Sequence, residues 1–164
     1  MKTFLLFFLV AFKITGNAQT AVFKYQYENQ QARAGHFSFK CSQDTTLNFE
    51  ADASAGYLGA ANNPYMQATV NAGPIPNGTW IISSIKNTDK VILRLTPEDD
   101  VNITDRDGFL IHGQGENETP AESSTGCIIL SREFRQKLMK AFQNYGAIQI
   151  TVTNFTTSDP TGNG

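Results

Sequence analysis

The stretch from Gly108 to Leu130, GFLIHGQGENETPAESSTGCIIL, carries the two side chains of this sequence best suited to covalent chemistry. His112 ends one short apolar run and Cys127 begins the next, and the chain has only two histidines and two cysteines. A thiolate is a strong nucleophile, but a free cysteine is mostly protonated at neutral pH. Because a neighbouring imidazole can remove the thiol proton, the pair predicts attack of a cysteine on a carbonyl with histidine as general base.

Two glycines extend this hypothesis. Gly113 follows His112 and can expose a backbone carbonyl that orients the imidazole. Gly126 leaves room for a carbonyl substrate next to Cys127, and the N–H groups of Gly126 and Cys127 can stabilise an oxyanion. If the two apolar runs are neighbouring strands, we expect the His112 ring and the Cys127 sulfur to lie within hydrogen-bonding reach.

Other interpretations of the same residues stay open. A lone buried cysteine is more often a small hydrophobic side chain than a nucleophile. Export of the chain would allow a disulfide between Cys41 and Cys127, and a non-catalytic binding domain of the cell envelope is then the alternative function. The two histidines and Cys127 form no ligand cluster for zinc, so we expect neither a metal nor another cofactor.

Residues 1–19 have the pattern of a secretory signal peptide. Lys2 precedes an apolar run from Phe4 to Phe12, which is too short to span a bilayer, and a cleavage site lies near Ala18. A buried first strand or helix is the alternative. We therefore predict a periplasmic or secreted protein without stable membrane insertion. The net charge of −2 supplies no basic field, so no nucleic acid is expected as a partner.

The rest of the chain predicts short strands around one helix. Apolar runs that alternate with polar residues, or are wholly apolar, recur between polar turns. Ser131 can cap an amphipathic helix that reaches Phe142, and Gly146 supplies a stop. We therefore predict a mainly β fold, a β-sandwich or partly open barrel with one C-terminal helix. It forms one domain over residues 20–154, followed by a disordered tail over residues 155–164.

The segment between Gly56 and Gly78 is rich in glycine, asparagine and proline, which argues against regular structure. A long ordered loop in a small domain commonly lines a functional site. We therefore expect this segment to form one wall of the Cys127 cleft, with Tyr57, Asn62 and Asn63 facing it as substrate-binding residues.

The motifs around the pair resemble the catalytic domain of L,D-transpeptidases, the YkuD-type enzymes of bacterial peptidoglycan. The signature of that family is His-Gly, a variable loop and Ser-x-Gly-Cys, which matches His112-Gly113 and Ser124 to Cys127. The closer resemblance is to the small branch of type VI secreted L,D-transpeptidase effectors, and it covers about residues 21–141. Its motifs occur in order as GYLG, NNP, GPIPNG, LRLTP, RDGFLIHG and GCIIL. Many YkuD-type enzymes have a second histidine where this chain has Thr125.

The resemblance implies a cysteine-dependent L,D-transpeptidase or L,D-carboxypeptidase that acts on peptidoglycan stem peptides through a thioacyl-enzyme. Cys127 would be the nucleophile and His112 the base, and an effector would also have an immunity or secretion partner. Ser124 and Arg106 match motif positions beside the substrate. Ser124 shapes the turn, and Arg106 either positions a substrate carboxylate or braces the loop. Bracing is favoured because an arginine near a strand end usually pairs locally.

Overall fold

The computed structural model describes residues 19–25, 27–28, 31–32 and 35–154. The predicted signal peptide, apart from Gln19, and the predicted tail over residues 155–164 lie outside the described residues.

Ten strands and one α-helix make up the described part of the chain. They are β1 Thr20–Tyr25, β2 Tyr27–Glu28, β3 Gln31–Ala32, β4 Gly35–Lys40, β5 Phe49–Ala55, β6 Gly78–Asn87, β7 Ile92–Pro97, β8 Leu110–His112, β9 Ile128–Ile129, α1 Arg132–Tyr145 and β10 Ile148–Asn154. Three short 3-10 helices lie in the connections, at Thr45–Leu47, Leu58–Ala60 and Pro64–Met66.

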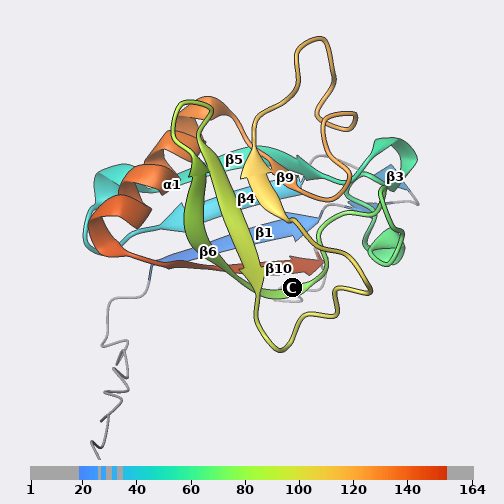
Figure 1. Ribbon diagram of the computed structural model, residues 1–164, viewed down its shortest axis with the longest axis horizontal. Coiled ribbons are helices and arrows are strands. Elements are labelled where there is room, and N and C mark those ends of the chain that lie inside the picture. The colour runs from blue at the N-terminus through green and yellow to red at the C-terminus, as the bar shows by residue number, and fades with distance from the viewer. Residues whose placement is uncertain (1–18, 26, 29–30, 33–34, 155–164) are drawn as a thin grey trace, which may run out of the picture.

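Eight of these strands close into a barrel in the order β1-β10-β6-β7-β8-β9-β5-β4, and β2 and β3 form a separate two-stranded sheet. Within the barrel β1 pairs with β10, and β8 pairs with β9, in parallel, while the other neighbours are antiparallel (Figure 1). The prediction of a mainly β fold with one C-terminal helix is confirmed. The strand order shows that the sheet forms a closed barrel, where we had predicted a β-sandwich or a partly open barrel.

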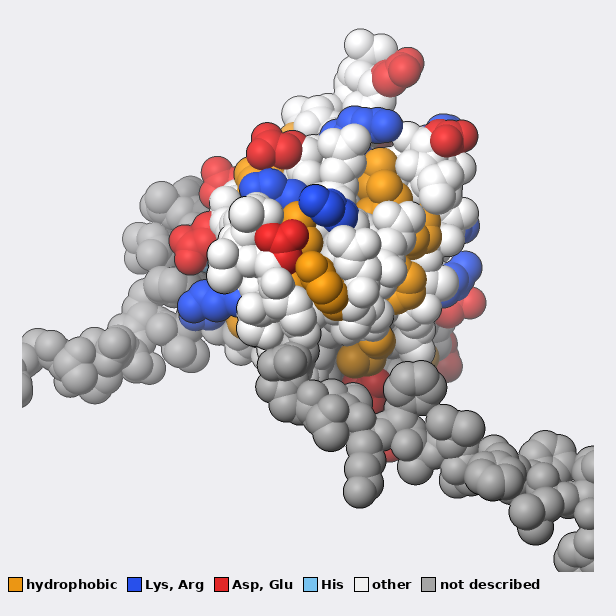
Figure 2. Space-filling view, turned by 90° about the vertical axis from the view of Figure 1, so that its left-hand side faces the viewer, with side chains coloured by type: hydrophobic (Ala, Val, Ile, Leu, Met, Phe, Trp, Pro, Cys, Tyr) orange, Lys and Arg blue, Asp and Glu red, His pale blue; other side chains and the backbone are white. Residues whose placement is uncertain are grey.

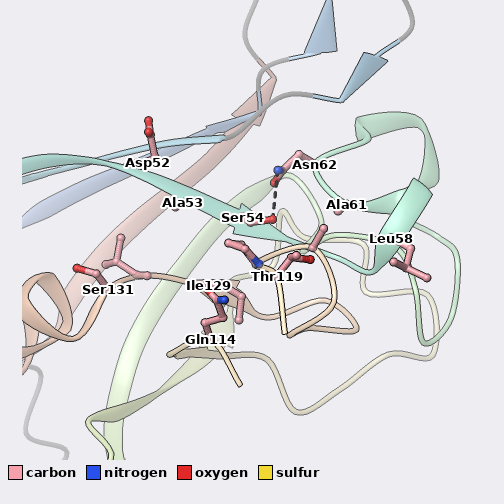
Figure 3. A pocket seen from close by; sticks show the side chains of 13 residues that line it. Asp52, Ala53, Ser54, Leu58, Ala61, Asn62, Gln114, Thr119, Ile129 and Ser131 are labelled. Carbon is pink, nitrogen blue, oxygen red and sulfur yellow. Dashed lines mark hydrogen bonds between the residues drawn. The ribbon is translucent and has the colours of Figure 1, made fainter. Parts of the chain in front are cut away.

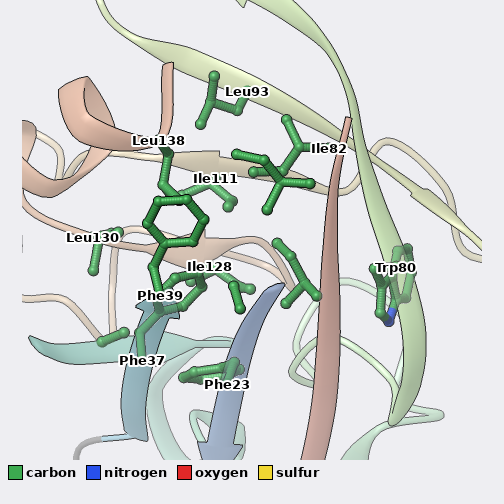
Figure 4. Packing of buried hydrophobic residues seen from close by; sticks show 14 of the residues in the cluster. Phe23, Phe37, Phe39, Trp80, Ile82, Leu93, Ile111, Ile128, Leu130 and Leu138 are labelled. Atoms are coloured by element: carbon green, nitrogen blue, oxygen red, sulfur yellow. The ribbon is translucent and has the colours of Figure 1, made fainter. Parts of the chain in front are cut away.

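The barrel interior is filled by aromatic and branched aliphatic side chains. Alternation along each strand sends every second residue inward, so Phe23 and Tyr25 of β1 are fully buried while Lys24 between them is exposed. Most of the largest buried side chains of the cluster come from six strands, α1 and the residue that follows β9 (Figure 4). They include Phe23, Phe37, Phe39, Trp80, Ile82, Leu93, Ile111, Ile128, Leu130 and Leu138.

Helix α1 lies at one end of the barrel (Figure 1) and contributes Leu138 and Ala141 to the core. The Phe134 ring of α1 stacks on the Phe49 ring of β5, with 4.7 Å between the ring centroids. Ser131 occupies the N-cap position, as predicted, but its side chain makes no capping hydrogen bond. No helix within the described residues is long and apolar enough to cross a lipid bilayer.

The surface carries charges of both signs. On the face drawn in Figure 2, lysine and arginine side chains are interspersed with aspartate and glutamate side chains, and hydrophobic side chains lie between them. This face therefore presents no large field of a single sign.

The parallel pairing of β8 with β9 determines where the predicted site lies. Ile111 pairs with Ile128, and both side chains are fully buried inside the barrel. Side chains alternate between the two faces of a strand. His112 follows the inward Ile111 and Cys127 precedes the inward Ile128, so both side chains face the outside. The connection between the two strands, residues 113–127, loops away from the barrel above this surface (Figure 1).

Candidate active site

Cys127 lies in a small cleft at the start of β9. The cleft has a volume of about 140 Å³ and is lined by Val70, Asn71, Asp105, Arg106, Asp107, Gly108, Phe109, Thr125, Gly126 and Cys127. The thiol sulfur lies 3.8 Å from the carbonyl oxygen of Gly108. Burial raises the pKa of the Cys127 thiol, although the backbone N–H of Leu110 and nearby positive charges oppose that shift. The thiol is therefore protonated at neutral pH and needs a base to become nucleophilic.

His112, at the end of β8, has the properties of such a base. Its Nδ1 lies 2.8 Å from the carbonyl oxygen of Gly113, so the orienting hydrogen bond that we predicted is present. A carbonyl only accepts, so Nδ1 carries the proton of the neutral ring and Nε2 has a lone pair for a substrate or thiol proton. Burial lowers the pKa of His112, which keeps the imidazole neutral at neutral pH.

The expected hydrogen bond between the His112 ring and the Cys127 sulfur is not formed in the described structure. The reason is the strand register: His112 pairs with Ile129, so Cys127 lies two residues further back along the neighbouring strand. With strands about 4.8 Å apart and a rise of about 3.3 Å per residue, their Cα atoms are about 8 Å apart. The two side chains are thus diagonal neighbours on one face, and a substrate or water can lie between them.

The turn before Cys127 is braced by Ser124. The Gly126 N–H donates to Ser124 Oγ at 3.0 Å, and the Ser124 hydroxyl donates to the Cys127 carbonyl at 2.7 Å. Ser124 is buried, and its predicted turn-shaping role is the one observed, whereas a contact with substrate stays a prediction. The Gly126 N–H, predicted as an oxyanion donor, is engaged by Ser124 Oγ in this arrangement. The role of the Cys127 N–H stays a prediction.

Arg106 is a brace as well. Its buried guanidinium donates to the carbonyls of Gly73 at 2.6 Å, Pro74 at 2.8 Å and Thr125 at 3.2 Å, and also to that of Gln67. These bonds tie the 67–74 segment to the Cys127 turn and engage both terminal amino groups of the guanidinium. Of the two predicted roles, bracing is therefore the one observed. The positive charge still acts on the Cys127 thiol, where it partly opposes the rise in pKa that burial causes.

The 56–77 segment does form a wall of the Cys127 cleft, but through Val70 and Asn71. None of the three residues predicted to face the cleft lines it, which corrects that prediction. Tyr57 is 39% exposed, and Asn63 caps the following 3-10 helix by accepting from the Tyr65 N–H at 3.0 Å. Asn62 is buried in a left-handed conformation that turns its amide back onto β5, where it binds the Ala55 N–H at 2.8 Å.

A larger hollow, here called the Ser54 pocket, lies on the same outer face and was not predicted from the sequence. It has a volume of about 490 Å³ and is lined by Asp52, Ala53, Ser54, Leu58, Ala61, Asn62, Gln114, Thr119, Pro120, Ala121, Ile129, Leu130 and Ser131. Figure 3 shows these side chains arranged around the Ser54–Asn62 hydrogen bond. Its lining comes from four separate segments of mostly small or apolar residues, a combination that no single motif signals.

Two positive charges near the pair were also missed. The buried guanidinium of Arg135 on α1 donates to the carbonyls of Leu130 at 2.9 Å and Val91 at 2.6 Å and packs against Gly113. Lys86 lies where the β6–β7 register shifts, and its charge lowers the pKa of both His112 and Cys127. Lys86 and Arg135 lie outside the stretch of sequence that contains His112 and Cys127, so no local motif indicates that their charges act on this pair.

Cys41 is buried, and both Cys41 and Cys127 are free cysteines. The Cys41–Cys127 disulfide of the alternative function is therefore not formed in this structure. The Cys41 sulfur lies 3.4 Å from Gln43 Oε1. Within the described part of the chain, no group of three or more His, Cys, Asp or Glu side chains could hold a metal ion.

The fold and this surface define a small closed β-barrel protein with an outward-facing cysteine and histidine. The family model of the Tlde1 domain matches residues 50–154, more than half of the chain, so the chain belongs to the Tlde1 domain family. That family is a type VI effector family separate from the YkuD-type enzymes, so the predicted YkuD-type membership was wrong. The shared motifs are short turns around a histidine and a cysteine, and such local arrangements recur in different families. A search of curated proteins found no match to this chain.

We expect Arg135→Gln to raise the pKa of His112, because the Arg135 charge holds it down. Lys86 on β6 also lowers this pKa and Glu118 in the adjoining loop raises it, and both remain in the variant. NMR titration of the His112 ring should therefore give a midpoint at higher pH than in the unmodified protein. Arg132→Gln removes an equal charge from an exposed position of the same helix and should leave the midpoint unchanged. An unchanged midpoint in Arg135→Gln would refute the electrostatic role.

We expect Gly126→Ala to lower the free energy of unfolding by about 3 kcal/mol. Gly126 has φ +152°, and an added Cβ would collide with the Arg106 guanidinium, which its carbonyl partners hold in place. Gly108→Ala is the matched control, because Gly108 has φ +72° but open space around its Cα, so only backbone strain of about 1 kcal/mol applies. Urea unfolding of both variants measures the difference, and equal losses would show that Arg106 yields freely.

Proposed function

We propose that this protein is a cysteine-dependent L,D-transpeptidase or L,D-carboxypeptidase that acts on peptidoglycan stem peptides through a thioacyl-enzyme. The observation that carries the proposal is the placement of the Cys127 thiol and the oriented His112 imidazole on one outer face. The direction of both pKa shifts supports general-base catalysis: the thiol is protonated, the imidazole is neutral, and the proton passes between them as the carbonyl is attacked.

In the first half of the reaction, Cys127 Sγ forms a bond to the substrate carbonyl carbon and its proton goes to His112 Nε2. The tetrahedral intermediate then loses its amine, which takes the proton from His112 and leaves a thioester. In the second half, an amine or water attacks the thioester carbon and gives its proton through His112 to the departing thiolate. An amine acceptor gives exchange or a cross-link, and water gives a carboxypeptidase.

The composition of the Cys127 cleft supports the substrate class. Asp105 and Asp107 line the cleft together with Asn71, and no carboxylate of the described chain forms an ion pair with Arg106. Two acidic residues in the lining of this cleft suit an acyl group that carries an ammonium, and the diaminopimelate residue of a stem peptide has such a group. An exported or delivered protein would meet this substrate in the cell envelope.

Mass spectrometry of purified muropeptides incubated with the full chain under reducing conditions tests the proposal. We expect tetrapeptide stems to lose a terminal D-alanine, and a brief incubation to leave an acyl adduct on the peptide that contains Cys127. Thiol titration of the native protein without reductant separates the alternative, because a binding domain with a Cys41–Cys127 disulfide would have no reactive thiol. Unchanged muropeptides together with the absence of any adduct would contradict the enzyme.

A further inference from the structure

We propose that the Ser54 pocket binds an N-acetylated sugar of the glycan strand to which the substrate stem peptide is attached. The inference rests on the proposed function and deepens it by adding a carbohydrate subsite to the site that acts on the peptide. Neither Cys127 nor His112 lines the pocket, so the sugar is held away from the bond that breaks.

The strand register places the pocket within reach of a tethered sugar. Ser54 of β5 pairs with Ile129 of β9, and Cys127 lies two residues before Ile129. With strands about 4.8 Å apart and a rise of about 3.3 Å per residue, the Cα atoms of Ser54 and Cys127 are about 8 Å apart. In a tetrapeptide stem, three residues connect the sugar to the carbonyl that loses D-alanine, and three extended residues span about 10 Å. A stem held at Cys127 can therefore place its sugar in the Ser54 pocket.

The polar groups inside the pocket are neutral and already oriented. Ser54 and Asn62 are only 6% and 5% exposed. The Asn62 side chain accepts from the Ala55 N–H at 2.8 Å and donates to the Ser54 hydroxyl at 3.3 Å, as Figure 3 shows. Among the described residues, the Ser54 hydroxyl donates to no acceptor, so a buried donor is left for a ligand. The carbonyl oxygen of an acetamido group is an acceptor of the required kind.

The walls of the pocket suit the rest of such a sugar. They are mainly apolar and include Ala53, Leu58, Ala61, Pro120, Ala121 and Ile129. The methyl of an acetamido group and the C–H face of a sugar ring gain by burial against such walls. No lysine or arginine lines the pocket, and its one ionisable side chain, Asp52, is exposed, so a charged ligand would lack a buried partner. The volume of about 490 Å³ lies in the range of small-ligand pockets.

Binding to a Cys127→Ala protein tests the subsite without turnover. We expect NMR titration to show the trimer of N-acetylglucosamine binding about tenfold more tightly than cellotriose, the glucose trimer that lacks acetamido groups. Ala121→Phe in the same background should remove this preference by filling the pocket, while the Ala121 carbonyl still accepts from the Leu58 N–H. Ala147→Phe, at an exposed position outside the pocket, is the matched control and should keep the preference.

A second variant tests the hydrogen bond without filling the pocket. Ser54→Ala should weaken binding of the N-acetylglucosamine trimer by about fivefold and leave the affinity for cellotriose unchanged, because only the acetamido carbonyl uses the hydroxyl. The amide spectrum recorded in the same titrations shows that each variant is folded. Equal affinity for the two trimers, or a preference that survives both Ala121→Phe and Ser54→Ala, would overturn the subsite.

Turnover separates this inference from the proposed function. In the active chain, we expect kcat/KM for a disaccharide tetrapeptide to exceed that for the sugar-free tetrapeptide by about tenfold, and Ala121→Phe to remove the difference. Release of D-alanine at the same rate from both substrates would refute the subsite and leave the enzyme standing. Preferred binding of the N-acetylated trimer without any acyl adduct on Cys127 would support the subsite and refute the enzyme.

Discussion

Cys127→Ala should abolish release of D-alanine from tetrapeptide stems while leaving the fold intact. Cys127 Sγ is the only atom proposed to attack the carbonyl, and loss of a covalent nucleophile costs several orders of magnitude in rate. The side chain is only partly buried at the edge of a cleft, so its truncation removes little packing. Muropeptide turnover measured by mass spectrometry, together with circular dichroism, checks both parts of this expectation.

Two further variants make the result specific to the thiol. Cys127→Ser should be nearly as inactive, because a hydroxyl has a far higher pKa than a thiol and is poorly matched to the same base. Cys41→Ala is the matched control, since Cys41 is the other free cysteine and is packed in the core. Full activity of Cys127→Ala would exclude the cysteine mechanism, and a loss confined to Cys41→Ala would identify Cys41 as the essential residue.

His112→Ala should lower kcat/KM at neutral pH by about 10² to 10⁴, the usual contribution of a general base. The remaining activity should increase steeply with pH, because burial raises the pKa of Cys127 and without a base only the spontaneously formed thiolate can attack. In the unmodified protein, activity should instead increase as His112 loses its proton, at a pH below the ordinary histidine range, since burial lowers its pKa. Profiles of kcat/KM against pH distinguish the two curves.

His36→Ala is the control for this change. His36 lies on β4 and faces Glu50 of β5 at 3.8 Å, away from the cleft residues. Its variant should keep the profile of the unmodified protein. A His112→Ala protein with full activity and an unchanged profile would mean that the thiol is activated by another group.

The sequence predicted the fold class, and it predicted that His112 and Cys127 lie at the ends of neighbouring strands, because each depends on local pattern. The apolar runs that became β8 and β9 are separated by a polar loop, and parallel pairing of the two strands brings their ends together. Gly113, being adjacent to His112, could also be predicted as the source of the orienting carbonyl. Contacts of this kind need only neighbouring residues or neighbouring strands.

The remaining features of the site depend on contacts between distant segments. Arg106 reaches carbonyls of the 67–74 segment, and Arg135 on α1 reaches the carbonyl of Val91. Asn62 was expected in the cleft, but its left-handed backbone turns it toward β5. The direction of a side chain in a long loop follows from such backbone turns and tertiary hydrogen bonds, which composition alone does not determine.

The pairing of β1 with β10 joins the two ends of the described chain, since Thr20 lies opposite Gln149 (Figure 1). Closure of the barrel therefore waits for the last strand, and the chain entropy lost in that contact is the largest of any strand pair. Until β10 arrives, β1 and β6 each present an open edge that can pair with other chains. A chain emerging from a ribosome thus keeps its barrel open, and stays prone to association, until β10 is free to fold.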